Sequence, residues 1–155
     1  AHKGTMVDPF PVGALDAASS AHSLWSNTAA AALVYHSPTV INFGFADKTL
    51  SMADVESGRA GEMSPTTESP LLVAFIRAIG LKAKDIQGFT LTGPDGRVIA
   101  QTEVPPLDSN MAERFMYVGK RKTGTEWPRG TYEAEFKIRR DGATALARKF
   151  SFDLK

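Results

Sequence analysis

The sequence predicts a mainly β protein: an immunoglobulin-like antiparallel β-sandwich of about seven strands, with one or two short helices near the N-terminal side. Two observations predict this fold. Short runs of alternating apolar and polar residues follow one another from residue 39 to residue 155, and turn-forming residues separate them. A chain of 155 residues is long enough for one domain with a substantial core.

The composition is that of an ordinary globular protein, with 43% hydrophobic and 23% charged residues. The net charge of +1 gives no reason to expect a nucleic acid as partner. Residues 111–155 are more basic, with eleven Lys and Arg against six Asp and Glu, which fits either solvated strand faces or a mildly basic surface. The chain has no cysteine, which excludes disulfides, thiolate catalysis and Cys-ligated metals. No run approaches the ~18 apolar residues of a membrane span, so none is expected.

We divide the chain into three segments: 1–10, a linker with a short helix over 11–38, and the sandwich over 39–155. Residues 11–26 are rich in Ala, Ser and Gly, as linkers are. Asn27 or Thr28 can cap a short helix over the run "AAAALVY", which should end before Pro38.

The run "TVINFGFA", residues 39–46, predicts the first strand of the sandwich. We expect its residues to alternate between two faces: Val40, Asn42 and Gly44 on one, and Ile41, Phe43 and Phe45 on the other.

After this strand, "SMADVESG" predicts one or two helical turns. Ser51 is the expected N-cap, Asp54 follows three residues later, and Gly58 should end the helix. The next residues, "RAGEMSPTTESP", are expected to form a loop.

The run "LLVAFIRAIG", residues 71–80, fits two structures. Its apolar spacing allows a helix that begins after Pro70, but a short and almost wholly apolar run is also typical of a buried central strand. We favour the strand, because every later segment has strand character.

Two hairpins follow. In the first, Phe89 and Leu91 alternate with threonines before the turn Gly93-Pro94-Asp95-Gly96, and residues 98–100 lead back. A further strand is expected at "RFMYVG", residues 114–119.

The final hairpin, residues 130–154, gives the clearest pattern. One face should hold the apolar residues Tyr132, Ala134, Phe136, Ile138, Leu146, Phe150 and Phe152. Directly opposed residues of an antiparallel pair point the same way. A two-residue Asp141-Gly142 turn would therefore place Phe150 and Phe152 on the solvent side, so we expect a three-residue loop, Asp141-Gly142-Ala143.

No constellation in the sequence assigns a catalytic, cofactor or metal residue. His2, His22 and His36 have spacings that match no metal-ligand motif. Glu133 and Glu135 could serve acid–base chemistry, but they alternate with Lys137 and Arg139, which indicates charge balance on an outward strand face.

The aromatic side chains at strand spacing are expected in the core rather than on a base-stacking platform; they are Phe115, Tyr117, Tyr132, Phe136, Phe150 and Phe152. In "EWPRGTY", Trp127 and Pro128 precede a strand. Tyr132 should bond back to the preceding backbone, as in a tyrosine corner.

The opening stretch "HKGTMVDPF" resembles the end of the closing hairpin of lysostaphin-type (LytM-domain) zinc metallopeptidases, through Gly4, Val7, Asp8 and Pro9. Residues 69–110, "FMYVGKR" and "WPRGTYEAEFKIRRDG" resemble the C-terminal extension of alphaproteobacterial members of that family. The resemblance covers most of the chain.

The resemblance implies peptidoglycan hydrolysis by a zinc site in a neighbouring catalytic domain. The family's His-x-His pair would lie upstream of Ala1, and its His-x-x-x-Asp motif is absent from this sequence, so no ligand position is carried over. No cofactor is therefore expected in this chain, although the resembled catalytic domain holds zinc.

Three functions remain open. The first is a non-catalytic accessory domain of a periplasmic or secreted peptidoglycan metalloendopeptidase, with its own catalytic domain or peptidoglycan as partner and residues 1–10 as a remnant of the closing hairpin. The second is a free-standing envelope adhesion or structural β-sandwich module. The third is an enzyme that uses His22 or His36.

Overall fold

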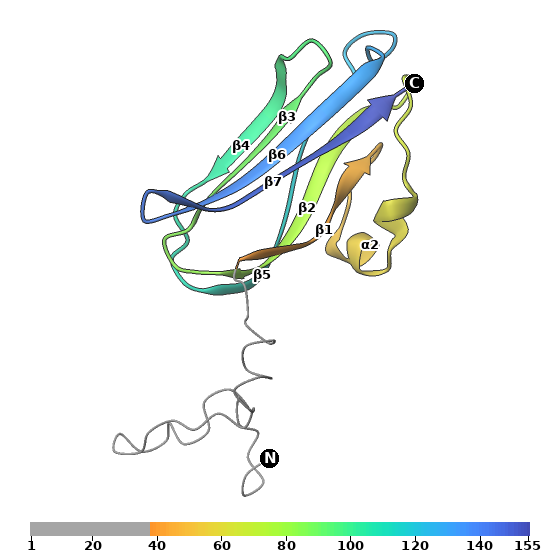
Figure 1. The fold of residues 1–155 in the computed structure, drawn as a ribbon. Coiled ribbons are helices and arrows are strands. Elements are labelled where there is room, and N and C mark those ends of the chain that lie inside the picture. The colour runs from red at the N-terminus through yellow and green to blue at the C-terminus, as the bar shows by residue number, and fades with distance from the viewer. Residues whose placement is uncertain (1–37) are drawn as a thin grey trace, which may run out of the picture. The chain divides into compact units, whose positions relative to one another are not determined.

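A computed structural model describes residues 38–155, and its seven strands form two antiparallel sheets (Figure 1). One sheet has the order β1-β2-β5 and the other β4-β3-β6-β7. The strands are β1 (Thr39–Ala46), β2 (Leu71–Leu81), β3 (Ile86–Thr92), β4 (Val98–Val104), β5 (Met111–Arg121), β6 (Gly130–Arg140) and β7 (Ala143–Leu154). The predicted β-sandwich is confirmed. The expected linker, the helix over "AAAALVY" and the remnant over 1–10 lie outside the described residues.

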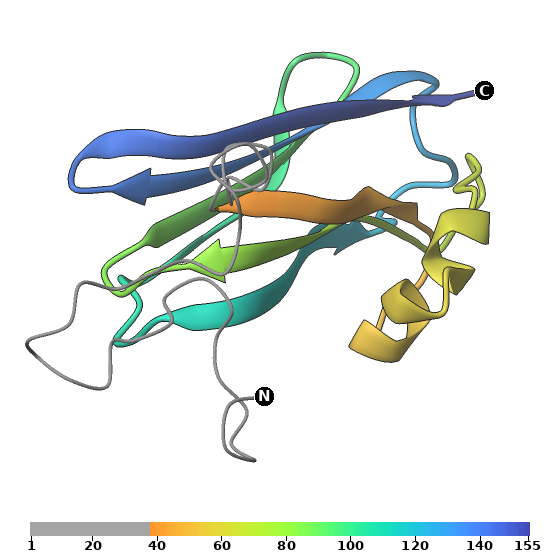
Figure 2. The ribbon, with the colours of Figure 1, turned by 60° about the horizontal axis from the view of Figure 1, so that its bottom comes forward.

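The two sheets face each other and enclose the main core (Figure 2). The chain changes sheet between β2 and β3, between β4 and β5, and between β5 and β6, as in immunoglobulin-like sandwiches. The fourth strand pairs with β3, so the second sheet has four strands rather than three.

The ambiguous run 71–80 is a strand, β2, with neighbours on both sides. Leu72 and Ile76 point into the sandwich and have no exposed surface. Val73 and Phe75 point the other way, where Val55 and other residues of a second apolar cluster cover them. Burial on both faces explains why this strand lacks the alternation of a half-exposed one.

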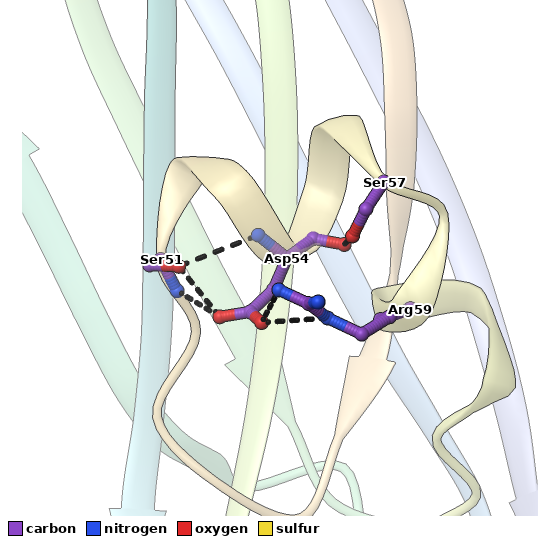
Figure 3. A network of polar contacts seen from close by, with 4 residues as sticks. All are labelled: Ser51, Asp54, Ser57 and Arg59. Atoms are coloured by element: carbon purple, nitrogen blue, oxygen red, sulfur yellow. Dashed lines mark hydrogen bonds and ion pairs between the residues drawn. The ribbon is translucent and has the colours of Figure 1, made fainter.

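The second cluster depends on a short helix, α2 (Met52–Glu56), followed by a 3-10 turn, η1 (Arg59–Glu62), where a loop was expected. The predicted capping box is confirmed (Figure 3): Ser51 N donates to Asp54 Oδ2 (2.9 Å), and Asp54 N donates to Ser51 Oγ (3.3 Å). The Ser51 hydroxyl also donates to Asp54 Oδ2 (2.6 Å), and this bond is the main cause that lowers the pKa of Asp54 to about 2, followed by the bonds from the Ser51 backbone N–H and from Arg59. Gly58 ends the helix with φ +80°, as predicted.

The loop between β6 and β7 differs from the prediction. Arg140 pairs with Ala143, so the loop has only two residues, Asp141 and Gly142, both with positive φ as a type I′ turn requires. The apolar residues of β7 nevertheless face the core, because a bulge at Ala145 shifts the register by one residue. The argument about facing was correct, but the extra residue lies in the strand and not in the loop.

A bulge also corrects the expected facing in β1. Val40 pairs with Ala78 and Asn42 with Arg77, so Ile41 is the extra residue. Val40 therefore lies on the core side together with Phe43 and Phe45, rather than opposite to them.

Five of the six aromatic residues expected in the core are buried or half-buried. Tyr132 and Phe136 have no exposed surface, and Phe150 and Phe152 pack against the main core. Tyr117 was predicted wrongly, because its side chain lies on the outer face of the three-stranded sheet and is 52% exposed. The alternation assigned Tyr117 a face, but within residues 38–155 that face is covered at Phe115 and left open at Tyr117.

A buried ion pair closes one end of the sandwich. Asp85, which has no exposed surface, precedes β3 and accepts two hydrogen bonds from Arg140 at the end of β6 (2.8 and 2.9 Å). It also accepts one from the backbone N–H of Lys82 (2.8 Å). The bonds from Arg140 and Lys82 outweigh burial and lower the pKa of Asp85.

Truncation of a core aromatic tests the assigned facing of β6. Phe136→Ala should lower the free energy of unfolding by about 3–5 kcal/mol, because the ring is wholly buried. Glu133→Ala, on the exposed face of the same strand, should change it by no more than about 0.5 kcal/mol. Urea melts measure both values, and equal losses would contradict the facing.

Asp85 should make folding stability depend on pH. Its pKa is lower in the folded state than in the unfolded chain, so the unfolded state binds more protons and stability rises with pH. The contribution is complete above the ordinary Asp value of about 3.9 and is lost as the pH falls through the lower folded value.

The control is Asp85→Asn, which should cost about 3 kcal/mol at pH 7, because Arg140 loses its buried partner but stays partly solvated. Urea melts between pH 2 and pH 7 should show the gap between the two proteins narrowing in acid. A gap that stays constant would contradict this role of Asp85.

Candidate functional site

The three histidines considered for a metal or catalytic site, His2, His22 and His36, all lie outside the described residues. Within residues 38–155, no group of three or more His, Cys, Asp or Glu side chains is placed to hold a metal ion. In the same range, no helix is long and apolar enough to cross a membrane.

The two glutamates considered for acid–base chemistry lie on the outward face of β6, as predicted. Glu135 pairs with Lys137 (2.7 Å) and with Lys149 on β7 (3.5 Å). The hydrogen bond from Lys137 is the main cause that lowers the pKa of Glu135. A carboxylate held ionised in this way balances charge on the sheet and is poorly suited to act as a general acid near neutral pH.

Within residues 38–155, an open depression with a largely apolar lining lies between the β3–β4 turn and the loop before β6. Its volume is about 320 Å³, within the range of small-molecule sites. The lining residues are Gly93, Pro94, Asp95, Arg97, Val98, Ile99, Lys120, Thr123, Trp127, Pro128 and Tyr132. We call this the Trp127 depression.

Hydrogen bonds fix the aromatic floor. Trp127 is 8% exposed, its Nε1 donates to the Ser69 carbonyl (2.8 Å), and its backbone N–H donates to Thr67 (2.8 Å). The Tyr132 hydroxyl donates to the Pro128 carbonyl (2.8 Å), which confirms the predicted tyrosine corner. Burial, with a smaller effect of Asp95, raises the pKa of Tyr132, so the phenol keeps its proton.

Gly130 allows the two walls of the depression to meet. Its φ of +131° is one that side-chain-bearing residues rarely adopt, and a Cβ there would lie 2.7 Å from Pro94 Cβ. Pro94 belongs to the turn Gly93–Gly96, whose backbone closes through Gly93 N donating to the Arg97 carbonyl (2.9 Å). The glycine thus lets the turn pack directly against the start of β6.

The rim is charged and mainly positive. Arg97 pairs with Asp95 at 3.6 Å, and both side chains are largely exposed. Lys120 makes no ion pair with any residue of the described part of the chain. An apolar floor with a free ammonium at its edge can bind a ligand that combines an apolar or sugar face with a carboxylate.

Sequence reasoning found part of this site. It identified Trp127 and Tyr132, but only as devices of the fold, and it placed Lys120 within a basic segment without a role. It missed the contribution of Pro94 and Arg97, because the contact between their turn and the loop before β6 depends on the packing of distant segments.

Comparison with known proteins adds no functional assignment. No family model and no curated protein matches the chain. Among solved structures, it is similar to part of the crystal structure of β-glucuronidase from Parabacteroides merdae, with a TM-score of 0.44 and 7% sequence identity. The match covers 59% of this chain and 12% of the enzyme chain, and a likeness this distant carries no argument about function.

Removal of one hydroxyl tests the tyrosine corner. Tyr132→Phe should lower the free energy of unfolding by about 1–2 kcal/mol, because the Pro128 carbonyl loses its donor while the ring stays packed. The matched control is Tyr117→Phe on the exposed face, which should leave stability unchanged within about 0.5 kcal/mol. Chemical denaturation measures both, and equal effects would contradict the assigned bond.

Proposed function

We propose that this chain is a non-catalytic accessory domain of a periplasmic or secreted peptidoglycan metalloendopeptidase and that it binds a cell-wall component. The resemblance of residues 4–9 and of the sandwich segments to lysostaphin-type peptidases supports the assignment to such an enzyme. The observation that carries the binding role is the Trp127 depression, with its apolar floor and the free Lys120 ammonium at its rim.

Peptidoglycan offers the chemistry that this depression fits. Its glycan strands present the flat apolar faces of sugar rings, and its short peptides carry carboxylates. A sugar ring packed on the floor beside Trp127 and Pro128 would leave a peptide carboxylate within reach of Lys120 or Arg97. Binding of this kind would hold the catalytic domain at its polymeric substrate.

Sedimentation with insoluble peptidoglycan tests this role. The purified chain should sediment with isolated sacculi, and Lys120→Glu should weaken binding about fivefold, because an attraction becomes a repulsion. Lys48→Glu is the matched control, since Lys48 is exposed and lies outside the depression. A wild-type chain that stays in solution, or equal losses in both variants, would contradict binding at this site.

The DNA sequence upstream of Ala1 separates this proposal from the alternative of a free-standing envelope adhesion or structural module. A reading frame that continues upstream and encodes the His-x-His strand and the His-x-x-x-Asp motif supports the accessory domain. An upstream sequence without these motifs favours the free-standing module.

A further inference from the structure

The four edge strands of the sandwich are not alike. β1 and β5 border one sheet, and β4 and β7 border the other. Unpaired backbone groups on an edge can pair with another chain, and a bulge is one device that prevents this. β1, β4 and β7 each contain a bulge, at Ile41, Ile99 and Ala145. β5 pairs with β2 without a register shift along its whole length, and it borders its sheet (Figure 2).

Within residues 38–155, part of the outer face of β5 is also left uncovered. α2 and η1 pack over β1 and β2, where they bury Val73 and Phe75. Beyond them, Phe115 is half-buried, and its ring lies 6.0 Å from that of Tyr117, which is 52% exposed. Among residues 38–155, β5 therefore presents both an open backbone edge and an aromatic surface beside it.

A hollow lies next to these rings at Gly119. A Cβ at this position would fall 2.4 Å from the Leu72 carbonyl oxygen, so the site must remain glycine. The space measures about 250 Å³, and its lining residues are Thr49, Leu71, Val73, Tyr117, Gly119 and Arg121. A side chain from a strand paired outside β5 could enter this space beside Tyr117.

The sequence of β5 is complementary to itself about Tyr117. In an antiparallel pair of two β5 strands centred on this residue, Gly119 lies opposite Phe115 and Arg121 lies opposite Glu113, each pair occurring twice. Opposed residues point to the same face, so Phe115 of one copy would meet the Gly119 hollow of the other. Arg121, which has no ion pair within residues 38–155, would meet a carboxylate.

We propose that two copies of this chain associate through β5 in this register. The two three-stranded sheets would join into one sheet of six strands with a two-fold axis at Tyr117. Backbone hydrogen bonds, the Phe115–Gly119 contacts and the Arg121–Glu113 pairs favour association. The same register places Arg114 opposite Lys120 on the other face, and this like-charged pair makes the dimer a weak one.

Charge reversal tests the register. In sedimentation equilibrium of the full chain, the wild type should show a monomer–dimer equilibrium. Arg121→Glu alone and Glu113→Lys alone should each weaken the dimer about 30-fold, because two attractive pairs become repulsive. A mixture of the two variants restores both pairs and should associate like the wild type. Lys155→Glu, at an exposed residue that follows β7 and lies outside β5, is the matched control and should leave the dimer unchanged.

Glu113 also pairs with Arg77, so its substitution can disturb the fold, and Tyr117→Lys provides an independent variant. It places two ammonium groups at the two-fold axis without touching the core, and it should abolish the dimer while leaving the melting curve unchanged.

A cysteine at the proposed axis gives a geometric readout, since the chain has no cysteine of its own. Tyr117→Cys should be cross-linked rapidly by a short bis-maleimide, whereas Val98→Cys, on the β4 edge and 54% exposed in the wild type, should not. A chain that stays monomeric at millimolar concentration, a mixture of charge variants that fails to associate, or equal cross-linking at both positions would each overturn the proposal.

Discussion

The strict alternation of side chains along each strand is the constraint on which this fold depends. Every strand must turn its apolar set toward the other sheet, and a shift of one residue reverses all of its side chains. Single extra residues correct the facing in β1, β4 and β7, at Ile41, Ile99 and Ala145. These strands are edges. A bulge in β2, β3 or β6 would interrupt two ladders instead of one, so the corrections lie where they disturb the least hydrogen bonding.

Local signals in the sequence predicted the parts of the fold that depend on neighbours in the chain. The capping box of Ser51 and Asp54, the buried face of β6 and the tyrosine corner at Tyr132 each involve residues within a few positions of one another. The bulge at Ala145 was missed because one extra residue, in the loop or in the strand, turns the apolar side chains of β7 toward the core equally well. The sequence pattern does not distinguish these two positions. Tyr117 was placed in the core because alternation gives a face but does not say what covers it.

The Trp127 depression was less accessible to prediction, because it joins segments about thirty residues apart in the chain. Trp127 and Tyr132 are fixed by backbone acceptors, yet the wall that completes the depression is the turn at Pro94. That turn can pack against the start of β6 only because Gly130 has a positive φ and lacks a Cβ. The sequence shows a glycine at the start of β6, but only the packed structure shows that Pro94 is the residue that it admits.

Successive residues at the end of β5 connect the two surfaces. Lys120 lines the Trp127 depression, and Arg121 points to the opposite face beside the Gly119 hollow. A β5 dimer would therefore carry two depressions in one rigid sheet, each next to the shared edge. On the repeating polymer proposed as the ligand, the second binding event would become intramolecular, so two weak sites would hold the dimer far more firmly than one site would hold a single copy. Weak pairing would suit this arrangement, because two copies bound to the same proposed polymer would already be held at a high local concentration.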